Sequence, residues 1–165
     1  MVIPIVTAIL IAAADQIIKF FIHENLSPNG RVSVIDGLLS LVYSENRGAA
    51  FGIFQDGTIF FIIVTSALMG IFFYLLAAHK FSGKLFYAAS TLILGGGLGN
   101  LIDRIFRGYV IDYLSVSFFP PICNFADYCI TVGAFLFVVS ILIAPEMKEK
   151  AENKTDLPDG ENTDE

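Results

Sequence analysis

Acidic, amide and arginine side chains gather at the ends of the most apolar segments of this sequence. Most of them fall between Gly99 and Asp127: Asn100, Asp103, Arg104, Asp112, Asn124 and Asp127. Such side chains are costly beside a membrane core unless they are paired or used. Two aspartates that meet at one water cannot both ionise easily, because each charge raises the pKa of the other. One ionised and one protonated carboxyl can activate water and polarise a carbonyl, which is the chemistry of metal-free peptide hydrolysis.

We expect the reacting pair to be Asp112 and Asp127. Asp112 lies in a short run of β-type alternation, with no charge nearby in sequence to neutralise it. If Asn124 caps a helix, Asp127 lies in its first turn, where the helix dipole favours negative charge. We therefore expect Asp127 to hold the charge and Asp112 the proton, in a pair that titrates as a unit. The residues alone leave a second interpretation open, in which one acid only caps a helix and the other is a solvated loop residue.

We expect the remaining polar side chains to support the site. Asp15 and Lys19 are four residues apart, so they can pair on one face of a helix, and we expect a structural role for both. Asp103 adjoins Arg104, which favours an ion-paired, structural role for this acid. Asparagines can hold carboxylates in place without adding charge.

Composition indicates a membrane protein. Hydrophobic residues make up 55% of the chain and the mean hydropathy is +0.71, whereas soluble domains are about 45 to 50% apolar. We expect a mainly α-helical fold with four transmembrane helices, because four apolar runs are long enough to cross a bilayer. These runs are residues 1–22, 58–78, 85–102 and 126–144. We expect the first to be a retained helix rather than a signal peptide, because it lacks a basic leading region.

The predicted membrane domain covers residues 1–145. From Glu146 onward eight acids and three lysines account for −5 of the net charge of −6, and such a polar segment is typical of disorder. We expect residues 146–165 to be an acidic, disordered tail. Between the first two spans, alternating residues flank Asp36-Gly37 from Arg31 to Tyr43, which predicts a β-hairpin lying on the membrane surface.

Four spans place the first and third loops on one membrane face and both termini on the other. Every candidate polar group then falls at the same face, including Asn46 in the first loop. Lysines lie mainly on the terminal side, which favours cytoplasmic termini by the positive-inside rule. Gly95 and Gly99 are spaced for a close contact between helices, which explains these glycines better than a nucleotide-binding loop does.

Neither the cysteines nor the histidines have metal-site spacing, so we expect no metal. Cys123 and Cys129 are expected to fill apolar space. A thiol protease built from Cys123 and His23 is a distant alternative, because no residue is apparent that would orient the pair.

Five motifs, in order and among four spans, resemble those of the prolipoprotein signal peptidases, or signal peptidase II. They are Asp15-Gln16-Ile17-Ile18-Lys19, Asn46-Arg47-Gly48-Ala49-Ala50-Phe51-Gly52, Gly99-Asn100-Leu101-Ile102-Asp103-Arg104, Val110-Ile111-Asp112-Tyr113 and Asn124-Phe125-Ala126-Asp127. The resemblance covers nearly the whole chain apart from the tail. The departures are Cys123, where a bulkier apolar residue is commoner, and the acidic tail.

The resemblance implies an aspartic endopeptidase of the bacterial cytoplasmic membrane, which cuts prolipoprotein precursors before a diacylglyceryl-modified cysteine. It implies catalysis by Asp112 and Asp127, with Asn46, Asn100, Arg104 and Asn124 lining or bracing the site and Asp15 as support. The hairpin would be an extracytoplasmic cradle, and residues 52–58 a mobile element over the site. We expect contact with membrane lipids, no cofactor, no nucleic acid and a monomer.

Two other classes of protein remain as alternatives. A small proton-coupled transporter also has short spans with intramembrane acids, but its ionisable group should lie near mid-membrane. Here the acids cluster at one interface. A lipid-binding membrane scaffold that uses the arginines and the hairpin is the other alternative.

Overall fold

Four long helices form the body of the protein. The structure, a computed structural model, describes residues 2–48, 57–78 and 83–155 of the chain, with side chains up to residue 143. The helices are α1 (Val2–Leu26), α2 (Thr58–Ala77), α3 (Lys84–Phe106) and α4 (Phe125–Thr155). Each is long and apolar enough to cross a membrane, in α4 over Phe125–Ile143. The four predicted spans are therefore confirmed, each to within a few residues.

Helix α4 continues beyond its membrane span. It runs to Thr155, past residue 146, at which the tail is predicted to begin. Residues 156–165 lie outside the described part of the chain, as do residues 49–56 of the second motif and of the predicted mobile element.

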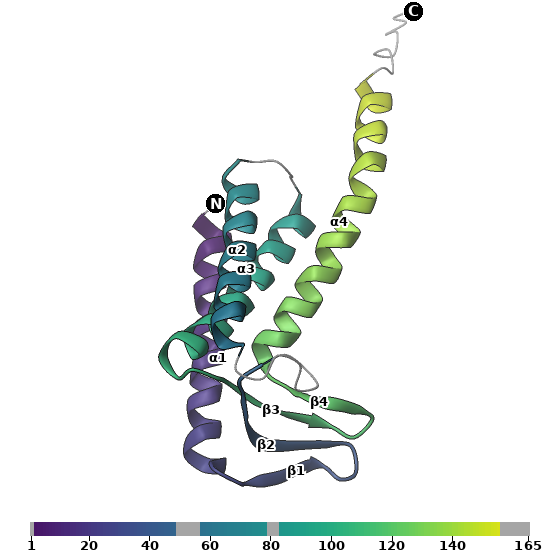
Figure 1. Ribbon diagram of the computed structural model, residues 1–165. Coiled ribbons are helices and arrows are strands. Elements are labelled where there is room, and N and C mark those ends of the chain that lie inside the picture. The colour runs from purple at the N-terminus through teal and green to yellow at the C-terminus, as the bar shows by residue number, and fades with distance from the viewer. Residues whose placement is uncertain (1, 49–56, 79–82, 156–165) are drawn as a thin grey trace, which may run out of the picture.

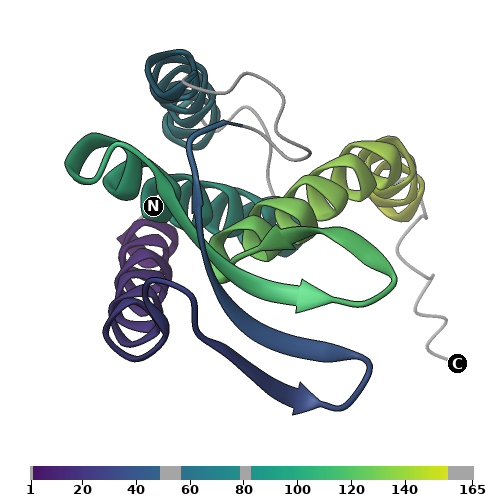
Figure 2. The same cartoon turned by 60° about the horizontal axis from the view of Figure 1, so that its bottom comes forward.

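Helix α3 is the central helix, with α1, α2 and α4 around it (Figure 2). Its glycines allow this close packing. A Cβ on Gly95 would lie 2.7 Å from Cβ of Ile11, and one on Gly99 would lie 2.5 Å from Oδ2 of Asp15, so the predicted glycine face meets α1. On another side, a Cβ on Gly96 would lie 2.5 Å from the carbonyl oxygen of Ala126 in α4. A larger residue at Gly95 or Gly96 would press on the backbone of a neighbouring helix, and one at Gly99 would displace the side chain of Asp15.

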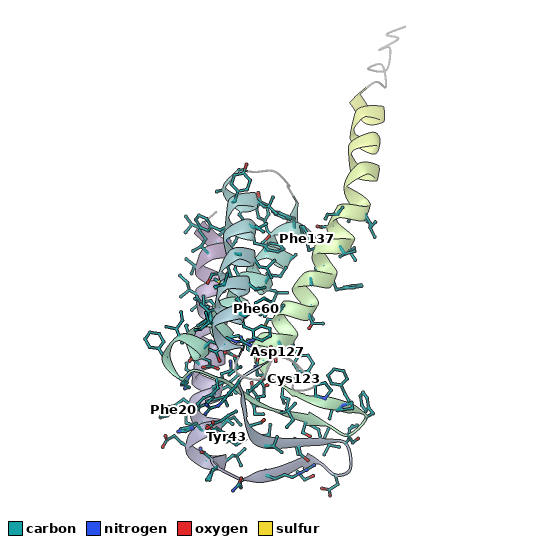
Figure 3. All side chains as sticks on the ribbon, viewed as in Figure 1. Phe20, Tyr43, Phe60, Cys123, Asp127 and Phe137 are labelled. Atoms are coloured by element: carbon teal, nitrogen blue, oxygen red, sulfur yellow. The ribbon has the colours of Figure 1, made fainter. Side chains whose placement is uncertain are left out.

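An aromatic cluster joins the helices at the end remote from the site. Phe137 of α4 is labelled in Figure 3. Its ring centroid lies 5.0 Å from that of Phe72 of α2 and 6.2 Å from that of Phe86 of α3. Outside this cluster the helices expose large apolar side chains such as Ile63 and Leu142. Such exposure is unfavourable in water and is expected of surfaces that face lipid.

A four-stranded antiparallel sheet lies across one end of the helices (Figure 1). Its strands are β1 (Arg31–Ile35), β2 (Leu39–Asn46), β3 (Val110–Val116) and β4 (Phe119–Cys123), in that order. The predicted hairpin is β1–β2, and Gly37 in its turn has a φ of 70°. The second hairpin, β3–β4, is an addition to the prediction.

The sheet is fixed to α1 by an apolar contact. Ile22 and Leu26 of α1 pack against Ile111 and Tyr113 of β3. The start of α1 and the end of α4 lie at the opposite end of the molecule from the sheet (Figure 1). This arrangement brings the ends of α1, α3 and α4 and the strands β2 and β3 together in one place.

Candidate active site

Two aspartates face each other across one asparagine where the sheet meets the helices. Asp112 lies on β3 and is 2% exposed, and Asp127 lies in the first turn of α4, next to Cys123 in space (Figure 3). The amide of Asn124 donates to Oδ1 of Asp112 at 2.6 Å, and its backbone N–H donates to Oδ2 of Asp127 at 3.1 Å. One residue therefore contacts both carboxyl groups.

The second oxygen of each aspartate also accepts an amide hydrogen. Asn46 donates to Oδ2 of Asp112 at 2.8 Å, and Asn100 donates to Oδ1 of Asp127 at 2.8 Å. The sheet register explains the first of these bonds. Asn46 pairs with Val110 and Ser44 with Asp112, so Asn46 is a diagonal neighbour of Asp112 on the same sheet face.

The side chain of each asparagine is oriented by a second hydrogen bond, which its amide carbonyl oxygen accepts from another residue. Gly48 N–H donates to Asn46 at 3.0 Å, Asp127 N–H donates to Asn124 at 2.9 Å, and the Lys19 ammonium donates to Asn100 at 2.9 Å. The three amide NH₂ groups consequently point to the aspartates. Donors aimed at a carboxylate favour its ionised form.

Asn124 and Asp127 also form the start of α4. Asn124 accepts the Asp127 N–H, and Asp127 accepts the Asn124 N–H, so two N–H groups that the helix leaves unpaired are satisfied reciprocally. The predicted cap at Asn124, with Asp127 in the first turn, is confirmed.

Burial sets the protonation of Asp112. Loss of solvent, and then the nearby charge of Asp127, raise its pKa from 3.8 to about 7, against the lowering effect of Asn46 and Asn124. A raised pKa means that the folded protein favours the protonated acid. The stability that this gives is complete below about pH 3.8 and is lost as the pH rises through about 7. Asp112 is the member of the pair suited to hold a proton near neutrality.

Arg104 lies beside the aspartates. Its guanidinium carbon is 5.1 Å from the ring centroid of Phe61, and its charge acts on Asp127 and Asp112. No residue of the described chain accepts a hydrogen bond from it. The prediction that Arg104 lines the site agrees with this position.

A buried ionic cluster lies next to the pair of aspartates. Lys19 contacts Asp15 at 2.7 Å and Asp103 at 2.8 Å, and all three side chains are fully buried. The predicted pairing of Asp15 with Lys19 is confirmed. The expected partner of Asp103 is wrong: it pairs with Lys19 and Arg107, not with Arg104. Successive residues on a helix point in different directions, whereas residues four apart share a face.

Gln16, Arg107 and Tyr113 also take part, although they are not among the predicted site residues. Gln16 donates to Asp103 at 3.2 Å and accepts from Arg107 at 3.1 Å. The hydroxyl of Tyr113 accepts the backbone N–H at the start of α4, at 3.1 Å. The i,i+4 spacing of Asp103 and Arg107 could have identified Arg107, and Gln16 and Tyr113 lie within the first and fourth of the five motifs.

A thiol protease does not fit this geometry. His23 pairs with Tyr43 at 3.2 Å, and the thiol of Cys123 lies 3.9 Å from the carbonyl oxygen of Pro121. Burial and the two aspartates raise the pKa of Cys123 to about 11, which keeps the thiol protonated. Among the described residues, no group of three His, Cys, Asp or Glu side chains could hold a metal ion.

The chain is similar to known membrane proteins along most of its length. It is 38% identical over 138 residues to the lipoprotein signal peptidase of Shouchella clausii, covering 84% of this chain and 91% of that protein. It is 40% identical over 132 residues to the lipoprotein signal peptidase of Caldanaerobacter subterraneus, covering 80% and 90%.

Two solved structures of bacterial membrane enzymes, determined by the in meso method, share the fold. One has a TM-score of 0.79 at 25% identity, covering 98% of this chain and 96% of that one. The other has a TM-score of 0.77 at 29% identity, covering 86% and 94%. The sequence profile of the family described as Signal peptidase (SPase) II matches residues 7–143. This chain is a multi-pass membrane protein and belongs to the signal peptidase II family of peptidases.

Proposed function

We propose that this chain removes signal peptides from bacterial prolipoproteins whose cysteine carries a diacylglyceryl group, with Asp112 and Asp127 as its catalytic aspartates. The observation that carries the aspartic assignment is the geometry of the pair. Both oxygens of each aspartate accept hydrogen bonds from amides, and Asn124 contacts both. Four amide donors thus hold two acids in fixed positions around one place.

The reaction follows from one protonated and one ionised carboxyl group. Asp127 takes a proton from water as the water oxygen bonds to the scissile carbonyl carbon, while Asp112 gives its proton to the carbonyl oxygen. In the resulting gem-diol, Asp112 takes a proton from one hydroxyl and Asp127 gives its proton to the nitrogen. The C–N bond then breaks to an acid and an amine, and both aspartates return to their starting states. The guanidinium of Arg104, which donates to none of the described residues, would hold a carbonyl group of the substrate.

The membrane position of the site suits a lipid-anchored substrate. Asp127 lies in the first turn of α4 and Asp112 lies on β3, and neither is midway along a membrane span, so a scissile bond at the membrane surface could reach them. We infer that the termini are cytoplasmic and that the sheet and the site face the outside of the cytoplasmic membrane. Since one chain supplies every residue of the site, we expect an active monomer.

The other two classes of protein have no such support. A transporter needs its ionisable groups along a path through the membrane, whereas Asp103 and Asp127 lie in the last turn of α3 and the first turn of α4. Neither the transporter nor the lipid-binding scaffold is supported by the similarities described above.

The proposal is tested with purified protein in lipid vesicles and one precursor in two forms. The first form carries a diacylglyceryl group on its cysteine, and the second has the same sequence with a free thiol. We expect cleavage of the first only, to give a product that begins at the modified cysteine, as measured by mass spectrometry. Equal cleavage of both forms would contradict the lipid requirement, and cleavage of neither would contradict the proposed function.

The turnover rate should fall as the pH rises through about 7. Asp112 must carry a proton to polarise the carbonyl, and its pKa is raised to about 7, so the active form disappears on the alkaline side. The measurement is kcat on the lipid-modified precursor on both sides of neutrality, with thermal stability followed at each pH. A kcat that stays constant well above neutrality, in protein that remains folded, would contradict a protonated Asp112.

A further inference from the structure

The ammonium group of Lys19 has three partners in the interior of the protein. It contacts Asp15 of its own helix at 2.7 Å and Asp103 of α3 at 2.8 Å, and it donates to Asn100 of α3 at 2.9 Å. Lys19 is 0% exposed. An ammonium has three hydrogens to donate, so all of them are used, and this one charge ties α1 to α3.

The two carboxylates that Lys19 holds reach the backbone immediately before each catalytic aspartate. Oδ1 of Asp15 accepts the N–H of Ala126 at 3.2 Å, and Oδ2 of Asp103 accepts the N–H of Ile111 at 3.3 Å. Ala126 precedes Asp127, and Ile111 precedes Asp112. Asp15 and Asp103 therefore connect Lys19 to the residues next to the two catalytic aspartates, on α4 and on β3.

The third contact of Lys19 reaches Asp127 through a side chain. Because Asn100 accepts from Lys19 through its carbonyl oxygen, its NH₂ group is left to donate to Asp127, at 2.8 Å. With its amide reversed, Asn100 would turn its carbonyl oxygen toward a carboxylate and its NH₂ toward an ammonium. Lys19 thus determines that the NH₂ group of Asn100, and not its carbonyl oxygen, faces Asp127.

We propose that Lys19 is a positioning residue for peptide cleavage, setting the separation of the segments that carry Asp112 and Asp127 and orienting the Asn100 amide. This inference rests on the proposed function and adds to it a long-range contact from α1. Lys19 touches neither aspartate of the pair, so it acts through Asp15, Asp103 and Asn100.

Besides these contacts, the charge of Lys19 acts on Asp112 through space. It lowers the pKa of Asp112, against burial and the charge of Asp127. Arg107 is the other cation of the cluster, and it pairs with Asp103 from a partly exposed position. Because Arg107 contacts neither Asn100 nor Asp15, it is a matched control that removes one cation from the same cluster.

The test compares Lys19→Met with Arg107→Met, using full-length protein in lipid vesicles and the lipid-modified precursor. We expect Lys19→Met to lower kcat about 100-fold with little change in KM, since displacement of catalytic groups by about 1 Å has an effect of this size. We expect Arg107→Met to lower the thermal midpoint and to reduce kcat of the folded protein far less than Lys19→Met does, because Asp15, Asp103 and Asn100 all keep their contacts with Lys19. An equal loss of kcat in both variants would overturn the proposal, as would a wild-type kcat in folded Lys19→Met.

A double variant separates positioning from stability. Lys19→Met alone leaves two buried carboxylates opposite one cation, whereas Lys19→Met with Asp15→Asn removes a charge of each sign, a replacement that proteins often tolerate. Asn at position 15 keeps an oxygen to accept the Ala126 N–H. We expect the double variant to regain thermal stability but not kcat, since nothing orients Asn100.

The double variant also keeps the proposal testable if Lys19→Met does not fold. Recovery of wild-type kcat together with stability would overturn the positioning role of Lys19. Failure of the proposed function is a separate result, because the wild-type protein itself would then leave the lipid-modified precursor uncut.

Discussion

Asp112→Asn and Asp127→Asn should each lower the cleavage rate by about 10⁴-fold, the upper range for loss of a general acid or base. Neither asparagine can exchange a proton as a carboxyl group does. Both replacements keep the size of the side chain, so the helices and the sheet should remain assembled. The measurement is single-turnover cleavage of the lipid-modified precursor in vesicles, with thermal unfolding followed on the same samples.

The environment of Asp127 adds a second effect to its replacement. Its two oxygens accept from Asn100 and from the backbone of Asn124, so the NH₂ group of an asparagine there must face a donor. Asn100 cannot reverse without losing Lys19. Leaving such a half-buried donor unpaired costs about 1 kcal/mol, the low end of the range for buried donors, and we expect Asp127→Asn to unfold at a lower temperature than wild type.

Asp36→Asn is the matched control for both replacements. Asp36 lies in the exposed β1–β2 turn and accepts a hydrogen bond from Ser33 at 2.7 Å, away from the site. Its replacement also removes one negative charge and should leave the cleavage rate unchanged. Near-wild-type turnover by folded Asp112→Asn or Asp127→Asn would remove that residue from the catalytic pair.

Gly96→Ala should destabilise the protein and lower activity, although alanine is the better helix former. The new Cβ would lie 2.5 Å from the carbonyl oxygen of Ala126 and 2.9 Å from Cγ1 of Ile130. A backbone carbonyl cannot move alone, so the first turn of α4 would shift and carry Asp127 with it. Overpacking of this kind costs about 1 to 3 kcal/mol, and displacement of Asp127 should lower kcat by about 100-fold.

The adjacent glycine supplies the control for this prediction. A Cβ on Gly97 would lie 3.3 Å from Cγ of Met69, in a flexible side chain that adapts readily. Gly97→Ala should therefore keep wild-type cleavage, with stability unchanged or raised by up to about 1 kcal/mol. Similar thermal midpoints and kcat values for the two variants would show that close packing at Gly96 does not hold Asp127 in place.

The sequence predicts the helices and the place of the site because both depend on simple physical rules. Apolar length marks the four spans, and alternation around Asp36-Gly37 marks the first hairpin. The order of the spans places Asn46 beside a region more than 50 residues later in the chain, and its bond to Asp112 agrees with that expectation. The cap at Asn124 follows from the three-residue spacing to Asp127 alone.

What the sequence does not predict depends on contacts between distant segments. Strand β4 contains Pro120 and Pro121, which argue against a strand because proline cannot donate to its neighbour. It forms as an edge strand that pairs with β3 on one side only. The placement of Lys19 between Asp15 and Asp103 requires the contact of α1 with α3, and no local pattern shows that Asp103, the one acid of α3, faces that helix.

The reciprocal bonds of Asn124 and Asp127 have a consequence for inhibition. Most residues that line an enzyme site can mutate to weaken an inhibitor, at the cost of some turnover. Asp127 and Asn124 each serve the helix start as well as the site, so a substitution that evades an inhibitor would also loosen the first turn of a membrane helix. A compound anchored on these two groups alone should therefore encounter few viable resistance mutations.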